Sequence, residues 1–208
     1  MSGWTGEVED EGAAVMILWA MSMWASAIVL AASDFGAEAF RRYGLSKWSV
    51  VVLGGTVWIL GWWAIIARSG MYRVDLGFVL LSAFAWIVVA VFGDGRWWLL
   101  APLLGVVGTM VRAVAPFSFH QAQVLPTGPI EALSLGVAGG LSLPDPLAAS
   151  AVAGAAEGLA CVLTAFGHAH GHNLGRHDLA ACIMAVVAAW LIAWVAALVH
   201  RKMIRRLA

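Results

Sequence analysis

Long uncharged stretches separated by short polar ones dominate the pattern of this chain. A helix needs about 20 apolar residues to cross the hydrocarbon core of a bilayer, with some tolerance. By that measure the pattern predicts about seven membrane-spanning helices, at approximately residues 12–33, 48–67, 76–93, 97–114, 130–143, 147–166 and 179–199. We therefore expect an all-α integral membrane protein, a polytopic bundle that forms a single transmembrane domain over residues 1–208.

One part of the pattern leaves the number of spans open. Residues 116–129 contain three prolines, and a lipid-facing helix cannot leave the backbone groups freed by proline unsatisfied, so a loop is expected there. The apolar stretch 130–143 is shorter than a usual membrane span and is followed by Pro144 and Pro146. It forms either a thin span or one arm of a re-entrant hairpin, and the second reading gives six spans plus a short helix.

The positions of Lys and Arg favour seven spans and predict an orientation. Cytoplasmic loops of membrane proteins carry an excess of these residues. With seven spans and the acidic N-terminus outside, eight basic residues fall inside and four outside, whereas the best six-span arrangement gives seven against five. The N-terminus is therefore expected outside the cytoplasm and the C-terminus inside it.

Composition agrees with a membrane protein and removes one class of partner. The chain is 62% hydrophobic and 12% charged, with a mean hydropathy of +0.88, whereas soluble domains are roughly 25% charged. The lipid bilayer is thus the first expected partner, and the 12 tryptophans suit interfacial belts. A formal net charge of zero gives no reason to expect nucleic acid binding.

A polar stripe is expected on the sixth span. Residues spaced by four, seven and eleven positions share a helix face. This spacing aligns Ser150, Glu157, Cys161 and Thr164. An ionised carboxylate at bilayer depth costs at least about 2.5 kcal/mol on insertion scales, so Glu157 should face the bundle and be protonated, hydrogen-bonded or paired. It either joins helices as a neutral group or relays protons or cations, unless the helix boundary lies elsewhere.

The turn after this span carries the residues most suited to metal binding: His168, His170, His172, His177 and Asp178. Imidazole is the commonest protein ligand for zinc, nickel and copper, and alternating histidines on an extended chain put their rings on one side. Cys161 and Cys182 lie near the same predicted membrane boundary, which makes a mixed site for a divalent metal ion feasible. The other readings are a polar interfacial loop and a turn that titrates near neutral pH.

Arg112 and Glu131 form a second candidate pair. Both lie at the outer ends of their predicted spans and are joined by the proline-rich loop. An ion pair between them would hold the two helices together. The functional alternative is an entrance for a polar or anionic group.

The known signatures of membrane enzymes and pigments are missing from the sequence. The two lysines, Lys47 and Lys202, both fall at predicted membrane boundaries, so no lysine is available for retinal inside the bundle. There is no His-Glu-x-x-His metalloprotease motif, no Gly-x-Ser-x-Gly elbow and no P-loop. We therefore do not predict an enzyme, although an unfamiliar active site stays open.

The segment Val152-Ala153-Gly154-Ala155-Ala156-Glu157-Gly158, followed by a polar connection and a final span, resembles the YphA-type membrane proteins of endospore-forming bacteria. The resemblance covers about seven residues in detail and most of the chain in layout. It implies a multi-pass protein of the bacterial cytoplasmic membrane with a sporulation context. It carries over no catalytic residue and does not include the histidine turn.

These observations favour a structural or interaction protein without enzymatic activity, as one subunit of a membrane assembly. Small residues let helices approach closely in lipid, so other subunits or a second copy of the chain are expected to bind through the four glycines Gly136, Gly140, Gly154 and Gly158. The alternative is a small transporter or a protein that handles divalent metals. In that case the histidine turn would collect the ion and Glu157 would pass it, or a proton, inward.

Overall fold

The chain folds into a helical bundle with one short β-hairpin. The computed structural model describes residues 4–33, 37–63, 66–69, 72–118, 127–167 and 174–207. Within these ranges the elements are α1 (Trp4–Ala32), α2 (Ala37–Arg42), α3 (Lys47–Trp63), β1 (Ile66–Ser69), β2 (Tyr72–Asp75), α4 (Leu76–Phe92), α5 (Gly95–Ser118), α6 (Thr127–Ser142), α7 (Pro146–Gly167) and α8 (Arg176–Leu207).

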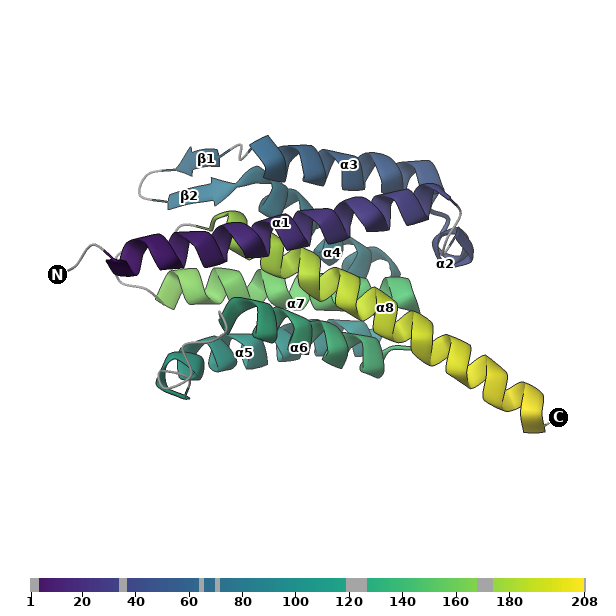
Figure 1. Ribbon diagram of the computed structural model, residues 1–208. Helices are drawn as coiled ribbons and strands as arrows, with labels where there is room; N and C mark the ends of the chain where they lie inside the picture. The colour runs from purple at the N-terminus through teal and green to yellow at the C-terminus, as the bar shows by residue number, and fades with distance from the viewer. Residues whose placement is uncertain are drawn as a thin grey trace.

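The long helices run back and forth side by side (Figure 1). The hairpin lies at the same end of the bundle as the start of α1, while α2 and the end of α8 lie at the other. α1 packs against α3 and α8, and α3 packs against α4, whereas α7 contacts α4, α5, α6 and α8. The centre of the bundle is therefore α7, and α1 and α3 form a layer beside it.

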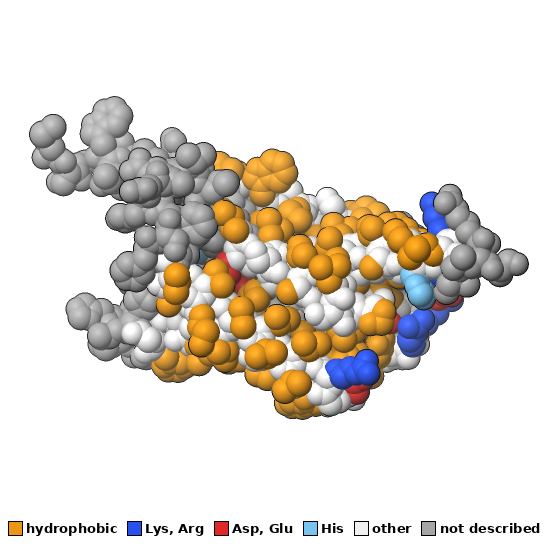
Figure 2. All heavy atoms as spheres, turned by 90° about the horizontal axis from the view of Figure 1, so that it is seen from below, with side chains coloured by type: hydrophobic (Ala, Val, Ile, Leu, Met, Phe, Trp, Pro, Cys, Tyr) orange, Lys and Arg blue, Asp and Glu red, His pale blue; other side chains and the backbone are white. Residues whose placement is uncertain are grey.

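Several of these helices are apolar enough to cross a membrane. Four described stretches qualify by length and hydropathy, namely Val15–Ala32, Gly95–Val114, Pro146–Gly167 and His177–Met203, and Leu76–Phe92 and Ile130–Ser142 are shorter apolar helices. The face shown in Figure 2 is largely covered by hydrophobic side chains, with its Lys and Arg side chains gathered at one end. Such a surface is stable only in contact with lipid, so the chain is an integral membrane protein.

The core around α7 is built from small residues. Of the 22 residues of Pro146–Gly167, 15 are buried inside the bundle, and most of those are Ala or Gly. Small side chains let neighbouring backbones come close, and van der Waals contact over that area is the main force that joins helices in lipid. α7 is thus surrounded by protein, although its composition alone resembles that of a lipid-facing helix.

The four glycines expected to bind other subunits are used within the chain. A Cβ added to Gly136 would lie 2.6 Å from the Ala185 carbonyl oxygen, and one on Gly140 would lie 2.9 Å from that of Ala189, so both glycines seat α6 on α8. Gly154 meets Val186, and Gly158 meets Ser82 of α4. All four are buried. The expectation that these faces receive a partner is therefore corrected, because the chain's own helices occupy them.

The second predicted span ends earlier than expected. α3 stops at Trp63, and residues 66 and 67, predicted as the end of the span, belong to β1 instead. β1 pairs with β2 in antiparallel register, with Arg68 opposite Arg73. The hairpin is tied to the start of α8, because the Asp75 amide donates to the Leu174 carbonyl at 2.8 Å. Pairing in the hairpin satisfies the backbone groups that lie between the two strands. If this polar segment continued the membrane helix instead, it would have to enter the lipid.

Other helices are longer than predicted. α5 continues to Ser118, so the expected loop at 116–129 begins later, and Pro116 falls in the last turn of the helix. The hydrogen bond that Pro116 cannot donate would go to the carbonyl of residue 112, so α5 lacks one helical bond close to its end. α6 is one continuous helix that packs along α7 and α8 (Figure 1). α8 runs through the basic tail to Leu207.

The start of α4 supplies a first testable prediction. Asp75, almost fully buried, is the N-cap of α4, and its Oδ1 accepts hydrogen bonds from the amides of Gly77 at 2.8 Å and Phe78 at 3.2 Å. Asp75→Ala should lower the free energy of unfolding in detergent by about 1 to 2 kcal/mol, since the capped amides would be left unpaired. Asp75→Asn keeps an accepting oxygen and should cost much less. Equal stability of the Ala and Asn variants would contradict this role of the cap.

Candidate functional site

The candidate site begins with a face of α5 on which two glycines precede an arginine. Gly105, Gly108 and Arg112 follow one another at helical spacing. A Cβ on Gly105 would lie 3.0 Å from the Ala156 carbonyl oxygen, and one on Gly108 would lie 3.2 Å from the Ala160 Cβ. The bare glycines thus bring α5 against α7. One turn further on, the Arg112 side chain reaches between the helices.

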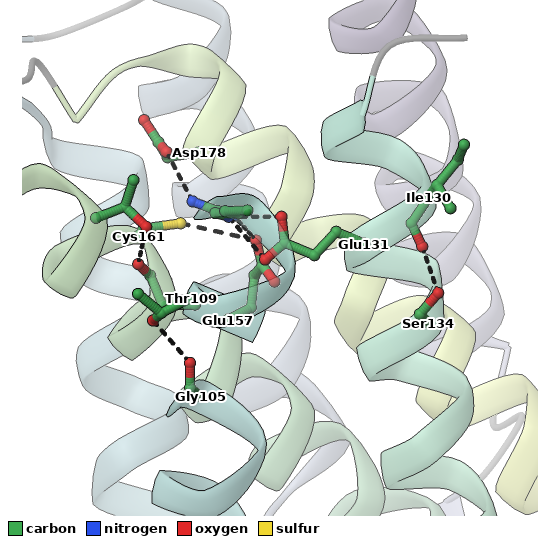
Figure 3. Close-up of polar contacts among 11 residues, drawn as sticks. Gly105, Thr109, Ile130, Glu131, Ser134, Glu157, Cys161 and Asp178 are labelled. Carbon is green, nitrogen blue, oxygen red and sulfur yellow. Dashed lines mark hydrogen bonds and ion pairs between the residues drawn. The ribbon is translucent and has the colours of Figure 1, made fainter. Parts of the chain in front are cut away.

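The Arg112 guanidinium meets carboxylates from three other helices. Figure 3 labels the three acidic residues, Glu131, Glu157 and Asp178. The Arg112 Nε donates to Glu131 Oε2 at 2.6 Å and to Oε1 at 2.7 Å, and its Nη2 donates to Glu157 Oε1. Its Nη1 lies 3.7 Å from Asp178 Oδ1. We call Arg112, Glu131, Glu157 and Asp178 the Arg112 cluster. It joins α5, α6, α7 and α8 through one side chain.

The cluster is nearly closed to the outside. The side chain of Arg112 is 16% exposed, that of Asp178 10%, that of Glu131 3% and that of Glu157 0%. Moving ions of this size into such surroundings costs several kcal/mol each unless they are paired with good geometry. Arg112 pairs with both oxygens of Glu131 and with one oxygen of Glu157, and it lies close to one oxygen of Asp178. The other oxygen of Glu157, Oε2, has no hydrogen-bond partner in the described part of the chain.

The polar stripe predicted on the sixth span leads into this cluster. Ser150 Oγ donates to the Val186 carbonyl at 3.1 Å, and Cys161 Sγ donates to Glu157 Oε1 at 3.7 Å. Thr164 Oγ1 donates to the Ala160 carbonyl of its own helix at 2.7 Å. Cys182 of α8 is buried, and both cysteines are free thiols. The stripe thus faces protein, as required for Glu157 at this depth.

The predicted metal ligands divide into two groups. His168, His170 and His172 lie outside the described residues. Of the other two, His177 is exposed and Asp178 is buried, with its Oδ2 accepting from the Gly175 amide at 2.9 Å. The Asp178 side chain therefore lies near Arg112 inside the bundle, whereas His177 is exposed on the surface. Over the described ranges, no group of three His, Cys, Asp or Glu side chains is placed to hold a metal ion.

The structure brings together residues that the sequence had left apart. The expected pair of Arg112 with Glu131 is present, but the pairing of Arg112 with Glu157 and Asp178 was missed. A signal for it lies in the charge balance, because Glu131, Glu157 and Asp178 all fall within or beside the predicted spans, and a carboxylate at that depth needs a positive partner from some helix. Counting charges across helices, rather than along one helix, would have linked the four residues.

No family model, curated protein or solved structure matches the chain. The resemblance to YphA-type membrane proteins therefore stays a prediction, and the function has to be argued from the Arg112 cluster itself.

Proposed function

We propose that this chain is a small proton-coupled membrane transporter in which the Arg112 cluster holds the coupling proton. The observation that carries the proposal is the excess of buried acid over buried base. Three carboxylates surround a single guanidinium in a site that is closed to solvent except near Asp178 and Arg112. A structural ion pair needs one carboxylate, so the two additional ones call for another explanation.

Charge balance supports a bound proton. With every group ionised the cluster would carry one positive and three negative charges, and arginine does not give up its proton in proteins. An uncompensated charge in the bilayer interior costs at least about 2.5 kcal/mol on insertion scales. Binding one proton lowers that cost, because the net charge of the cluster changes from −2 (one positive and three negative charges) to −1. Glu157 is the natural carrier, because Oε1 accepts from Arg112 while the buried Oε2 has no partner among the described residues.

The gradient of exposure supports access from one end. The side chains of Arg112 and of Asp178, in the first turn of α8, are 16% and 10% exposed, whereas Glu157 is fully buried near the middle of α7. A proton that enters beside Asp178 would pass from one carboxylate to the next around Arg112, which keeps its own protons. If the basic end of the bundle is cytoplasmic in the seven-span arrangement, entry is from the opposite side of the membrane.

Beyond Glu157 the bundle is closed. One turn deeper, Gly154 lies against Val186 of α8 and Ala85 of α4, and Ala153 and Ala155 are fully buried. This apolar layer blocks passage toward the α2 end. A site open on one side and sealed on the other is what one state of an alternating transporter requires. Protonating Glu157 would weaken its attraction to Arg112 and so favour a change in how α5 packs against α7.

A test of proton binding needs no knowledge of the transported substrate. Infrared spectra of the purified protein, recorded across a pH titration, should contain the carbonyl band of a buried protonated carboxylic acid. We expect Glu157→Gln to remove that band and to leave the unfolding midpoint close to that of the wild type, since the amide still accepts from Arg112. Glu38→Gln changes an exposed carboxylate on α2 and should leave the band intact. A wild-type spectrum without a buried acid band would refute the proposal.

A structural role is the second candidate, and one observation favours it. Arg112 bonds to or faces carboxylates on α6, α7 and α8, so it holds together the half of the bundle that contains the core helix. A subunit of a membrane assembly would need this rigidity without any proton exchange. The same infrared titration separates the two functions, because a purely structural cluster shows no carboxyl group whose protonation changes with pH.

A further inference from the structure

A second site lies in the other half of the bundle, where α1 and α3 cover α4, α7 and α8. It is a cavity of about 470 Å³, lined among others by Trp19, Trp24, Leu53, Phe84, Ala151 and Trp190. Ligand sites commonly measure roughly 300 to 1,000 Å³. α1 packs mainly along α3 and α8, and α3 packs along α4. The layer formed by α1 and α3 therefore contacts the other helices mainly along its two edges, and the cavity lies between them.

The cavity offers almost nothing to a polar ligand. The described residues that line it include no charged side chain. Of its serines, Ser26 donates its hydroxyl to the Ser22 carbonyl at 2.9 Å, and Ser150 donates to the Val186 carbonyl at 3.1 Å. These hydroxyls are already engaged with the backbone. The part of the ligand inside the cavity is therefore hydrocarbon.

The rim of the cavity belongs to the lipid-facing surface. Trp19 and Leu30 of α1 and Leu191 of α8 line the cavity and are also exposed on the outside of the bundle. The lining of α1 extends from Trp19 to Ala31, a rise of about 18 Å at 1.5 Å per residue. One leaflet contributes about 15 Å of hydrocarbon. The cavity thus has the length of a single acyl chain and opens to the lipid that supplies it.

One end of the cavity meets a basic helix. Phe40 of α2 lines that end and is followed by Arg41 and Arg42, with Lys47 at the start of α3. Arg42 is paired with Asp145 at 3.0 Å, whereas Arg41 is exposed. Basic side chains at the level of the headgroups attract anionic lipids. We propose that the cavity binds one acyl chain of an anionic glycerophospholipid from the leaflet at the α2 end, with its phosphate near Arg41.

This site is independent of the proton site. Gly154, Val186 and Ala85 pack between the cavity and Glu157, so the lipid contacts none of the four residues of the Arg112 cluster. The lipid would fill the space between the α1 and α3 layer and the core, and hold that layer in place. Failure of the infrared test on Glu157 would leave this proposal standing, and the reverse also holds.

Native mass spectrometry of the purified protein, incubated with phosphatidylglycerol or phosphatidylcholine, tests the proposal. We expect the wild type to retain one phosphatidylglycerol and to bind phosphatidylcholine more weakly. Ala27→Trp fills the cavity from α1 and should weaken phosphatidylglycerol binding roughly tenfold or more, a change that corresponds to about 1.4 kcal/mol. Val29→Trp, on the same helix but outside the lining, should bind as the wild type does. Arg41→Gln should reduce the preference for phosphatidylglycerol without changing phosphatidylcholine binding.

Two results would overturn the proposal. One is a wild type that retains no phospholipid, and the other is Ala27→Trp binding as tightly as Val29→Trp. Equal binding of both lipids by the wild type would overturn the assignment of the phosphate to Arg41. If Ala27→Trp fails to fold, Leu53→Trp fills the same space from α3, and the wild-type measurement decides by itself whether a lipid is held.

Discussion

Replacing Arg112 with methionine is expected to lower the free energy of unfolding by about 3 to 5 kcal/mol, the range typical when one partner of a buried ion pair is removed. The side chain is the counter-ion for Glu131 and Glu157, and it also faces Asp178. Methionine fills similar space but leaves three buried carboxylates without a positive charge. Most of the loss comes from those stranded acids rather than from the energy of the bonds themselves.

The origin of this loss can be tested by neutralising the acids as well. Arg112→Met combined with Glu131→Gln, Glu157→Gln and Asp178→Asn should recover most of the stability, because replacing an entire buried ionic group is often close to neutral. Arg96→Met alters an exposed arginine at the start of α5 and should change stability by less than about 0.5 kcal/mol. The measurement is reversible unfolding in mixed detergent micelles. A single Arg112 variant as stable as the Arg96 variant would show that the cluster does not hold the helices together.

Adding one methyl group to Gly136 is expected to be the second large effect, at about 1 to 3 kcal/mol of destabilisation, the usual range for overpacking. Its Cβ would lie 2.6 Å from the Ala185 carbonyl oxygen and 2.7 Å from the Ala188 Cβ. The nearest atom belongs to the backbone of α8, which cannot rotate away as a side chain would. Gly136→Ala therefore forces α6 and α8 apart along their shared face.

A matched glycine of α3 supplies the control for this prediction. A Cβ on Gly55 would have nothing within 4 Å, so Gly55→Ala gains helix propensity without a clash. It should leave stability unchanged or raise it by up to about 1 kcal/mol. Thermal unfolding of the two variants in the same detergent gives the comparison. If Gly136→Ala were as stable as Gly55→Ala, the close approach of α6 to α8 would be wrong.

Much of the secondary structure could be predicted from the sequence because lipid imposes one strong rule. Every backbone group in hydrocarbon must be paired within its own helix, so hydropathy alone locates the helices. The predicted spans at 76–93 and 147–166 match α4 and α7 within one residue at each end. The end of the second span was wrong because α3 stops at Trp63 and the chain continues as the hairpin of β1 and β2 at one end of the bundle.

The position of Glu157 shows how far a sequence argument reaches into the site. Because an ionised Glu157 is costly in lipid, the residue was expected to face protein. The stripe of Ser150, Cys161 and Thr164 identified the face of the helix that turns inward. The same argument placed Arg112 beside Glu131, because a short loop joins their helices. Contacts between helices distant in sequence, such as that of Arg112 with Asp178, depend on how the helices pack, which no periodicity along one helix records.

The sequence by itself thus determined that this is a membrane protein, where most of its helices lie, and that Glu157 turns toward other helices, because hydropathy and the cost of buried charge act locally. Only the tertiary structure decided that Gly136, Gly140, Gly154 and Gly158 serve the chain's own packing and that three carboxylates share Arg112. The cavity proposed to bind an acyl chain also depends on the tertiary structure, because several helices line it. The physical reason is that small residues permit close contact with any helix, and the choice of neighbour follows from how all the helices pack together.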